Sequence, residues 1–130
     1  MKEVISTTAA PEAVGAYSQG IATDDFVFTA GQIALTPDGE FLEDASIADQ
    51  TTRCLKNVEG ILQARGLDML DVVKVTVFLD DIEQFEAMNE AYAEFFDDEP
   101  PARSAIEVAG LPLGAGIEIE AIAARSGNED

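Results

Sequence analysis

The segment Val72–Leu79 constrains the fold of this chain more than any other. It reads Val-Val-Lys-Val-Thr-Val-Phe-Leu, a nearly continuous run of β-branched and apolar side chains. Such a run is typical of a strand that is covered on both faces. Helical patterns flank it, from about Ser46 to Arg65 and from Ile82 to about Phe96. Because two helices can cover only one face of a sheet, we expect self-association to bury the other face.

The two helices are predicted from their apolar spacing and from their ends. Ser46 with Asp49 three residues later resembles a capping box, and Gly66 ends the first helix. Asp81 caps the second helix, and the pair Pro100–Pro101 stops it. The predicted buried stripes are Ile47, Cys54, Val58, Ile61 and Leu62 in the first helix, and Phe85, Met88, Tyr92 and Phe95 or Phe96 in the second.

Outside these segments, the sequence predicts strands and turns. The predicted strands are Val14–Ile21, Phe26–Leu35, about Arg103–Val108 and about Ile117–Ala124. Gly31 inside a strand indicates a bulge or a close backbone approach, and Thr36–Glu40 is a turn that contains Pro and Gly. The predicted fold class is therefore α+β, a single domain over residues 1–130. It has a mixed sheet of five to six strands with two helices on one face.

The chain is strongly acidic. Its 26 Asp and Glu against 7 Lys and Arg give a formal net charge of −19. Binding to a phosphate backbone depends on clustered Lys and Arg, so this balance argues against nucleic-acid partners. The acids are scattered over predicted helix faces and loops, which is typical of a solvated surface. Because such self-repulsion destabilises a compact state unless salt screens it, we expect a halophilic protein from a high-salt cytoplasm.

Two features of the composition narrow the chemistry. The chain has no histidine, which excludes a His-based triad and a His zinc site. Acid–base work must then fall to Asp, Glu, Tyr, Lys or an ordered water. Cys54 is the only cysteine, so there is no internal disulfide, and the thiol is predicted to be an inert core group. Since no run of about 18 apolar residues and no secretory leader is evident, we expect no membrane partner and a cytoplasmic location.

Arg103 is the first candidate for a functional residue. It follows the rigid Pro100–Pro101 pair and is the first residue of a predicted strand, not an exposed residue on the surface of a helix. Arginine suits the planar, bidentate recognition of carboxylates. With a carboxylate delivered by the neighbouring strand, it would form a compact site for a small anionic substrate. The alternative is a surface arginine that pairs with one of the many acids.

Glu118 and Glu120 are candidates for the carboxylate. They alternate with Ile117 and Ile119, so both lie on the same side of the last predicted strand. A glutamate on a partly covered sheet face can have a raised pKa and can position water. The alternative is a solvated strand face, and the residues alone leave both interpretations open.

Two further polar residues have simple structural interpretations. Tyr17, on a predicted strand, would pack in the core with its hydroxyl satisfied. Asn89 lies at the edge of the second helix's apolar stripe and would be an exposed polar residue. The sequence contains no phosphate-binding loop, dinucleotide fingerprint or metal-ligand cluster.

Five motifs follow one another along nearly the whole chain. They are Gly15–Gly20, Thr29–Ile33, Val75–Leu79, Pro101-Ala102-Arg103-Ser104 and Ile117-Glu118-Ile119-Glu120-Ala121-Ile122-Ala123. Together they resemble the RidA (YjgF) family of enamine/imine deaminases. The last two motifs are the most specific part of this resemblance.

The resemblance implies a chorismate-mutase-like fold and a homotrimer with active sites between subunits. It implies hydrolysis of 2-aminoacrylate and 2-iminobutanoate to 2-keto acids and ammonia. Arg103 would bind the substrate carboxylate and Glu118 would orient the attacking water. Because a protonated imine is already an electrophile, no cofactor, metal or covalent nucleophile is needed. The other matching positions would line the substrate site: Tyr17, Gly31, Ala105 and Asn89.

The chain departs from the family pattern at three positions. Many members have Ser where Ala30 stands, Cys where Ala105 stands, and Pro where Ala16 stands. Loss of a hydroxyl at position 30 would weaken a polar contact and alter substrate preference. Loss of the thiol at position 105 matters little if the backbone there contacts the ligand.

Two other functions are compatible with such a resemblance. One is a non-catalytic trimer that binds small carboxylates as a sensor or chaperone-like module. The other is the ribonuclease activity attributed to some family members. The charge of −19 and the lack of histidine argue against the second function.

The acidic composition generates a prediction about stability. Raising KCl from low to molar concentration is expected to raise the midpoint of thermal unfolding, because counterions screen the repulsion among the carboxylates. Melting curves followed by circular dichroism would measure this change. A midpoint that does not respond to salt would contradict the prediction.

Overall fold

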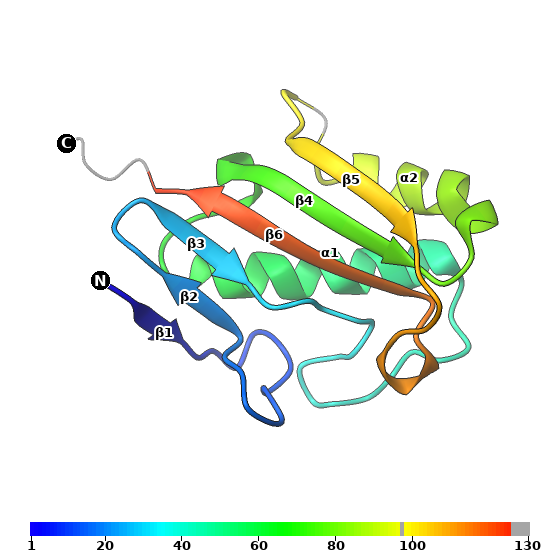
Figure 1. The fold of residues 1–130 in the computed structure, drawn as a ribbon, viewed down its shortest axis with the longest axis horizontal. Coiled ribbons are helices and arrows are strands. Elements are labelled where there is room, and N and C mark those ends of the chain that lie inside the picture. The colour runs from blue at the N-terminus through cyan, green and yellow to red at the C-terminus, as the bar shows by residue number, and fades with distance from the viewer. Residues whose placement is uncertain (97, 126–130) are drawn as a thin grey trace.

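The computed structural model describes residues 1–96 and 98–125, which form one six-stranded mixed sheet with two α-helices on one face (Figure 1). The strands are β1 (Glu3–Ile5), β2 (Gly20–Ala22), β3 (Phe26–Thr29), β4 (Val72–Leu79), β5 (Ala102–Glu107) and β6 (Ile117–Ala124). The helices are α1 (Ile47–Gln63) and α2 (Phe85–Ala93), with short 3-10 turns at Met69–Asp71, Ile82–Gln84 and Pro112–Gly114. This arrangement confirms the predicted α+β class and the helices on one face. Within the described residues, neither α-helix is long and apolar enough to cross a membrane.

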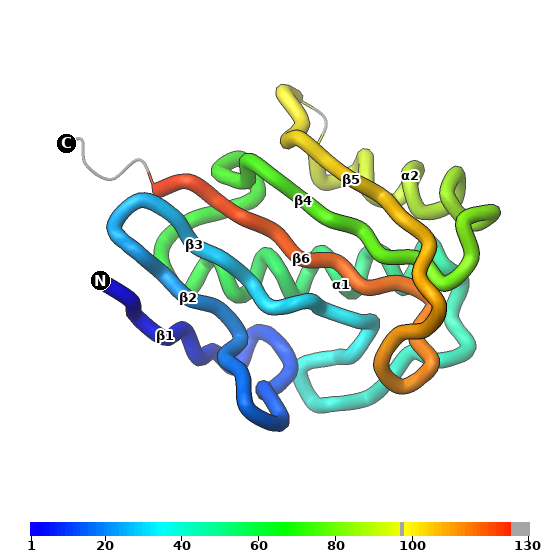
Figure 2. Tube along the Cα trace, in the orientation of Figure 1, coloured from blue at the N-terminus to red at the C-terminus, as the bar shows by residue number. Residues whose placement is uncertain are grey.

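The strand order is β1-β2-β3-β6-β4-β5, so β4 lies between β6 and β5 (Figure 2). The pairs are antiparallel except β4–β5, which is parallel. A parallel pair needs a long crossover, and the segment that contains α2 provides it. Strand β5 is consequently an edge strand, one strand removed from β6.

The register between β4 and β6 assigns each side chain to one face of the sheet. Val75 pairs with Ala121 and Val77 pairs with Ile119, and all four are buried beneath the helices. Side chains alternate along a strand, so the even-numbered residues of β6, and those of β4 from Lys74 onward, lie on the opposite face. We call that opposite face the open face. It carries Lys74, Thr76, Phe78, Glu118, Glu120 and Ile122. An irregularity in the register between Val72 and Lys74 leaves Val72 buried on the helix-covered face.

The core lies between the sheet and the helices. Helix α1 begins at its predicted cap, where the Asp49 backbone N–H donates to Ser46 Oγ at 3.1 Å. Its fully buried apolar side chains are Cys54, Leu55, Val58, Ile61 and Leu62. The predicted stripe contained all of these except Leu55, and it also contained Ile47, which is half-buried. Burying each Leu or Ile contributes roughly 1.5–3 kcal/mol. Burial also raises the pKa of the Cys54 thiol, as expected for an inert core group.

Helix α2 is shorter than predicted. It ends at Ala93, and the next backbone N–H groups donate to carbonyls three residues earlier, which tightens the chain before Pro100–Pro101. Met88, Tyr92 and Phe96 are buried as predicted, while Phe85 is half-buried.

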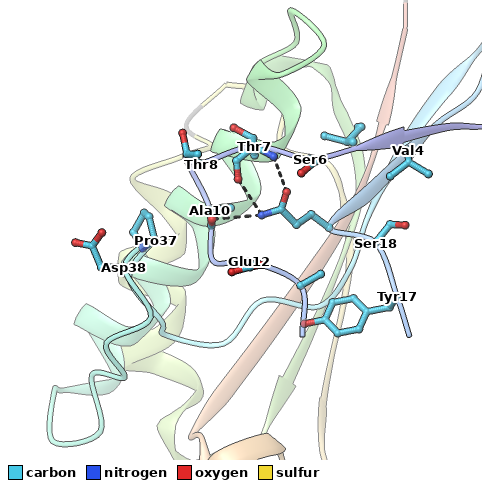
Figure 3. Close-up of a pocket in the computed structure, with 13 residues that line it drawn as sticks. Val4, Ser6, Thr7, Thr8, Ala10, Glu12, Tyr17, Ser18, Pro37 and Asp38 are labelled. Atoms are coloured by element: carbon cyan, nitrogen blue, oxygen red, sulfur yellow. Dashed lines mark hydrogen bonds between the residues drawn. The ribbon is translucent and has the colours of Figure 1, made fainter. Parts of the chain in front are cut away.

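The predicted strand Val14–Ile21 is wrong over most of its length, because only Gly20 and Ile21 belong to β2. The preceding residues form a loop that turns at Gly15, where φ is +116°. Gln19 holds this loop: its amide accepts from the Thr7 backbone N–H and donates to the carbonyls of Thr7, Ala10 and Pro11. Figure 3 shows these bonds near Thr7 and Ala10. A side chain that substitutes for strand hydrogen bonds carries no periodic signal in the sequence.

The predicted strand Phe26–Leu35 is also too long. Strand β3 ends at Thr29, and the ladder resumes at a single bridge between Gln32 and Ile119. Gly31 lies at the interruption, as its position in the sequence indicated. The predicted turn Thr36–Glu40 is present, with Gly39 at φ +92°.

The open face remains apolar around a polar centre. Val4, Phe26, Phe28 and Ile106 on this face are 58%, 41%, 39% and 46% exposed. Both α-helices lie on the other face. The structure therefore leaves uncovered the face that the sequence predicted to be buried by self-association.

Candidate functional site

Arg103 extends from β5 toward α2. It pairs with Val75 of β4, which places it on the helix-covered face of the sheet. Its Nη1 donates to Asn89 Oδ1 at 2.7 Å. The guanidinium carbon lies 4.6 Å from the ring centroid of Tyr92 and 5.4 Å from that of Phe85. We call Arg103, Asn89, Tyr92 and Phe85 the arginine site.

No acid in the part of the chain that the structure describes forms an ion pair with the Arg103 guanidinium. Among residues 1–96 and 98–125, the ion pairs are Met1 with Asp24 and Arg65 with Glu3. With one donor bonded to Asn89, most of the five N–H donors of Arg103 have no partner among the described residues. The Arg103 side chain opens into a cavity of about 340 Å³ lined by Asn89, Tyr92, Ala93, Phe96, Pro100, Pro101 and Arg103.

Glu118 extends from β6 on the open face. Gly31 faces it so closely that a Cβ at this position would lie 2.8 Å from Glu118 Cδ. Any side chain at position 31 would therefore displace the carboxylate. The family resemblance assigned Gly31 a backbone contact with ligand, and the structure shows that it also makes room for Glu118.

The environment of Glu118 favours its protonated form. Burial raises the pKa of the Glu118 carboxyl, and the negative charge of Glu120 raises it further. The two glutamates lie on the same face of β6, as their alternation predicted. A glutamate with a raised pKa is closer to the range in which it can accept and return a proton near neutral pH.

A cavity of about 710 Å³ adjoins Glu118. Tyr17 lies on its edge, 54% exposed, and its hydroxyl accepts a weak bond from the Val14 backbone N–H at 3.4 Å. The expectation that Tyr17 packs in the core is wrong, because its segment is a loop and not a strand. We call Glu118, Gly31 and Tyr17 the glutamate site. Its cavity is completed by Pro11, Glu12, Val14, Gln19, Ala30, Gln32, Ile33, Leu35, Pro112 and Leu113.

The arginine and glutamate sites lie on opposite faces of the sheet. Arg103 shares the helix-covered face with Val75, whereas Glu118 pairs with Phe78 on the open face. Strand β4 also separates β5 from β6. The expectation that a neighbouring strand delivers the carboxylate beside Arg103 within one chain is therefore wrong. Strand order is a long-range property that residue spacing does not report.

The two remaining predicted residues belong to the arginine side. Ala105 lies two residues after Arg103 on the same face of β5, pairs with Val77 and packs against the core. Asn89 is half-buried and hydrogen-bonded to Arg103, so the exposed interpretation was wrong.

The contact of Tyr92 and Phe85 with Arg103 was missed by sequence reasoning. Both were predicted as core residues, and Tyr92 is indeed buried. Phe85, Asn89 and Tyr92 have the spacing i, i+4, i+7, so one face of α2 carries all three. The sequence shows that spacing, but it does not show that Arg103 of β5 lies against this face of α2.

These features define an acidic α+β protein whose sheet carries the Arg103 guanidinium on one face and a glutamate of raised pKa on the other. The family model described as Endoribonuclease L-PSP matches residues 7–125. The chain therefore belongs to this family, which is the RidA (YjgF) family that its motifs resemble.

The relatives cover the chain almost completely. The RutC family protein PH0854 of Pyrococcus horikoshii is 50% identical over 123 residues, which is 95% of this chain and 98% of that protein. The human 2-iminobutanoate/2-iminopropanoate deaminase is 44% identical over 123 residues, 95% of this chain and 90% of that enzyme. The crystal structure of Escherichia coli TdcF with bound serine has a TM-score of 0.91 and 44% identity, covering 95% of this chain and 99% of that chain. These structural matches confirm the fold that the resemblance implied.

The glutamate site generates a prediction about proton binding. The midpoint of Glu118 titration is expected to lie above the ordinary glutamate value of about 4.3. Glu120→Gln is expected to lower this midpoint, because it removes a negative charge but leaves the burial of Glu118 in place. Carboxyl ¹³C shifts followed by NMR against pH would measure both values.

Glu94→Gln provides the matched control, because Glu94 is exposed at the end of α2 and is not among the causes of the Glu118 shift. It should leave the Glu118 midpoint unchanged. A wild-type midpoint in the ordinary range, or one insensitive to Glu120→Gln, would count against the described environment.

Proposed function

We propose that this protein hydrolyses reactive 2-imino and 2-enamino acids, such as 2-iminobutanoate and 2-aminoacrylate, to 2-keto acids and ammonia. The observation that carries the proposal is the guanidinium of Arg103, which has no acidic partner among residues 1–96 and 98–125 of a chain of net charge −19. Such a group is suited to bind a small carboxylate. The name of the human relative, 2-iminobutanoate/2-iminopropanoate deaminase, supports the substrate class. The serine bound to the related TdcF is also a small molecule that carries a carboxylate.

Arg103 would hold the substrate carboxylate through two N–H donors, while Nη1 remains bonded to Asn89. Fixing one end of a small substrate also fixes the position of its imine carbon. This restriction of orientation is a principal source of rate acceleration for a reaction that involves only water and an electrophile. Ala105, next along the same face of β5, would lie beside the carboxylate.

Glu118 would position the attacking water and accept its proton. The water oxygen bonds to the imine carbon as the C=N electron pair moves to nitrogen, giving a carbinolamine. Glu118 then returns its proton to the nitrogen. As the C–N bond breaks and ammonia leaves, the carbinolamine hydroxyl gives its proton to the Glu118 carboxylate and its oxygen becomes the 2-keto oxygen. General base catalysis of this kind contributes typically about 10²–10⁴-fold. Tyr17 and the backbone at Gly31 would line the substrate cavity beside Glu118.

A complete site would need two copies of the chain. The arginine and glutamate sites lie on opposite faces of one sheet, so a single copy cannot bring Arg103 and Glu118 to one small substrate. Apposition of two copies would join the arginine site of one with the glutamate site of the next, and would also cover the exposed Phe26 and Phe28. We take the assembly to be the homotrimer that the family resemblance implies, with three such sites.

The alternative is a protein that binds small carboxylates without turnover, because the same Arg103 site would also bind a carboxylate that is not converted. An RNA substrate is not proposed, despite the family description, because −19 opposes phosphate binding. We place the activity in the cytoplasm, where the lone buried Cys54 would remain a thiol.

A coupled assay with a serine or threonine dehydratase tests the activity. Added wild-type protein is expected to speed the appearance of keto acid, and Arg103→Ala is expected to remove nearly all of this effect because the carboxylate loses its partner. Lys74→Gln would serve as the control, because it removes a cation on the open face that neither site uses. Equal acceleration by Arg103→Ala would contradict the assigned role, and saturable keto-acid binding without acceleration would favour the binding protein.

Co-expression of two inactive variants tests the shared site. Arg103→Ala and Glu118→Gln subunits are each expected to be inactive alone. Random mixing in a closed ring leaves about one quarter of the interfaces with both intact residues, and so about one quarter of wild-type activity. Separately purified and unmixed variants provide the control. A mixed assembly as inactive as its parents would show that the site lies within one subunit.

A further inference from the structure

Three side chains on one face of α2 hold the Arg103 guanidinium without opposing its charge. Asn89 contributes a neutral amide oxygen at 2.7 Å, and Tyr92 and Phe85 contribute aromatic rings at 4.6 and 5.4 Å. Both rings lie within the roughly 6 Å range of cation–π attraction. Although the chain has 26 acidic residues, these three contacts of the Arg103 guanidinium are with uncharged side chains.

Tyr92 is the more rigid of the two rings. It is 5% exposed and its centroid lies 4.7 Å from that of Phe96, so packing fixes its plane. Its buried hydroxyl has no hydrogen-bond partner among the described residues. Burial raises the pKa of this hydroxyl, so the ring is neutral near neutral pH. The contact with Arg103 is therefore made by the ring face and not by a phenolate charge.

An acid in the place of this ring would neutralise the guanidinium that the substrate needs. A salt bridge would compete with the substrate carboxylate for the same N–H donors. A ring face attracts the cation and leaves its in-plane donors free. A long, rotatable arginine that is ordered before binding also loses less conformational entropy when the carboxylate arrives.

We propose that Tyr92, supported by Phe85, is a positioning residue that presents the Arg103 guanidinium to carboxylate ligands and thereby sets the selectivity of the site for charged 2-keto and 2-imino acids. This inference rests on the proposed function for the identity of the ligand. Tyr92 acts through Arg103 and does not contact the reacting atoms.

The test compares binding of 2-oxobutanoate with that of its uncharged analogue 2-oxobutanamide, by isothermal titration calorimetry. Tyr92→Leu keeps an apolar side chain but removes the ring face. It is expected to weaken 2-oxobutanoate binding by about 3- to 30-fold while changing 2-oxobutanamide binding by less than about twofold. Tyr92→Phe keeps the ring and removes a hydroxyl that has no partner, so it is expected to restore the selectivity for the carboxylate.

Two further variants separate positioning from folding. Phe85→Leu is expected to weaken 2-oxobutanoate binding by about twofold, less than Tyr92→Leu, because the Phe85 ring lies farther from the guanidinium. Because Phe85 is half-buried, this variant can replace Tyr92→Leu in the comparison if Tyr92→Leu does not fold. Phe95→Leu is the matched control, because Phe95 packs on the same core, whereas the cation–π contacts of Arg103 among the described residues are with Phe85 and Tyr92. In turnover, the expected change for Tyr92→Leu is a higher KM at nearly constant kcat, as for an interaction that serves substrate and transition state equally.

The inference is overturned if Tyr92→Leu binds 2-oxobutanoate as tightly as the wild type. It is also overturned if the variant loses affinity equally for the keto acid and the amide, since that result indicates only a damaged fold. A wild type that binds 2-oxobutanoate through Arg103 but shows no turnover would refute the deaminase and leave the positioning role intact. Loss of carboxylate selectivity in Tyr92→Leu, with rescue by Tyr92→Phe, supports it.

Discussion

The antiparallel register between β4 and β6 decides on which face of the sheet the candidate residue Glu118 lies. Val77 against Ile119 buries one face of each strand beneath the helices, and the two-residue period then sends Glu118 to the open face. A slip by one residue would bury Glu118 and expose Ile119, which the apolar burial of the core opposes. The Glu118 carboxylate is thus held on the open face by the packing of its apolar neighbours.

Local periodicity predicted the parts of the fold that depend on local contacts. The stripe of α1, its Ser46 cap and the central strand β4 follow from spacing that a short window of sequence contains. Strand order does not, because pairing β4 between β5 and β6 joins segments far apart in the chain. For this reason the sequence identified Arg103 and Glu118 as candidates but placed them wrongly beside each other.

The site residues outside regular structure were harder to predict. Tyr17 belongs to a loop held by the buried Gln19 amide, and no periodicity marks a loop that a side chain ties to distant backbone groups. Phe85 and Tyr92 pose a different difficulty. Their helical spacing is clear, but an aromatic residue on an apolar stripe is usually core packing, and only the position of β5 shows that these rings also hold a cation.

The charge of the whole chain makes the surroundings of Arg103 significant. A net charge of −19 repels an anionic ligand at long range, although at physiological ionic strength this repulsion is screened beyond a Debye length of about 8 Å. Under the proposed function, recognition of a carboxylate would therefore depend on the electric field within a few ångströms of the guanidinium. Aromatic rings and one amide are neutral partners that leave the net charge of the guanidinium in place, whereas a carboxylate in contact with it would cancel that charge. The more acidic the surface, the more a carboxylate site depends on neutral neighbours for its cation.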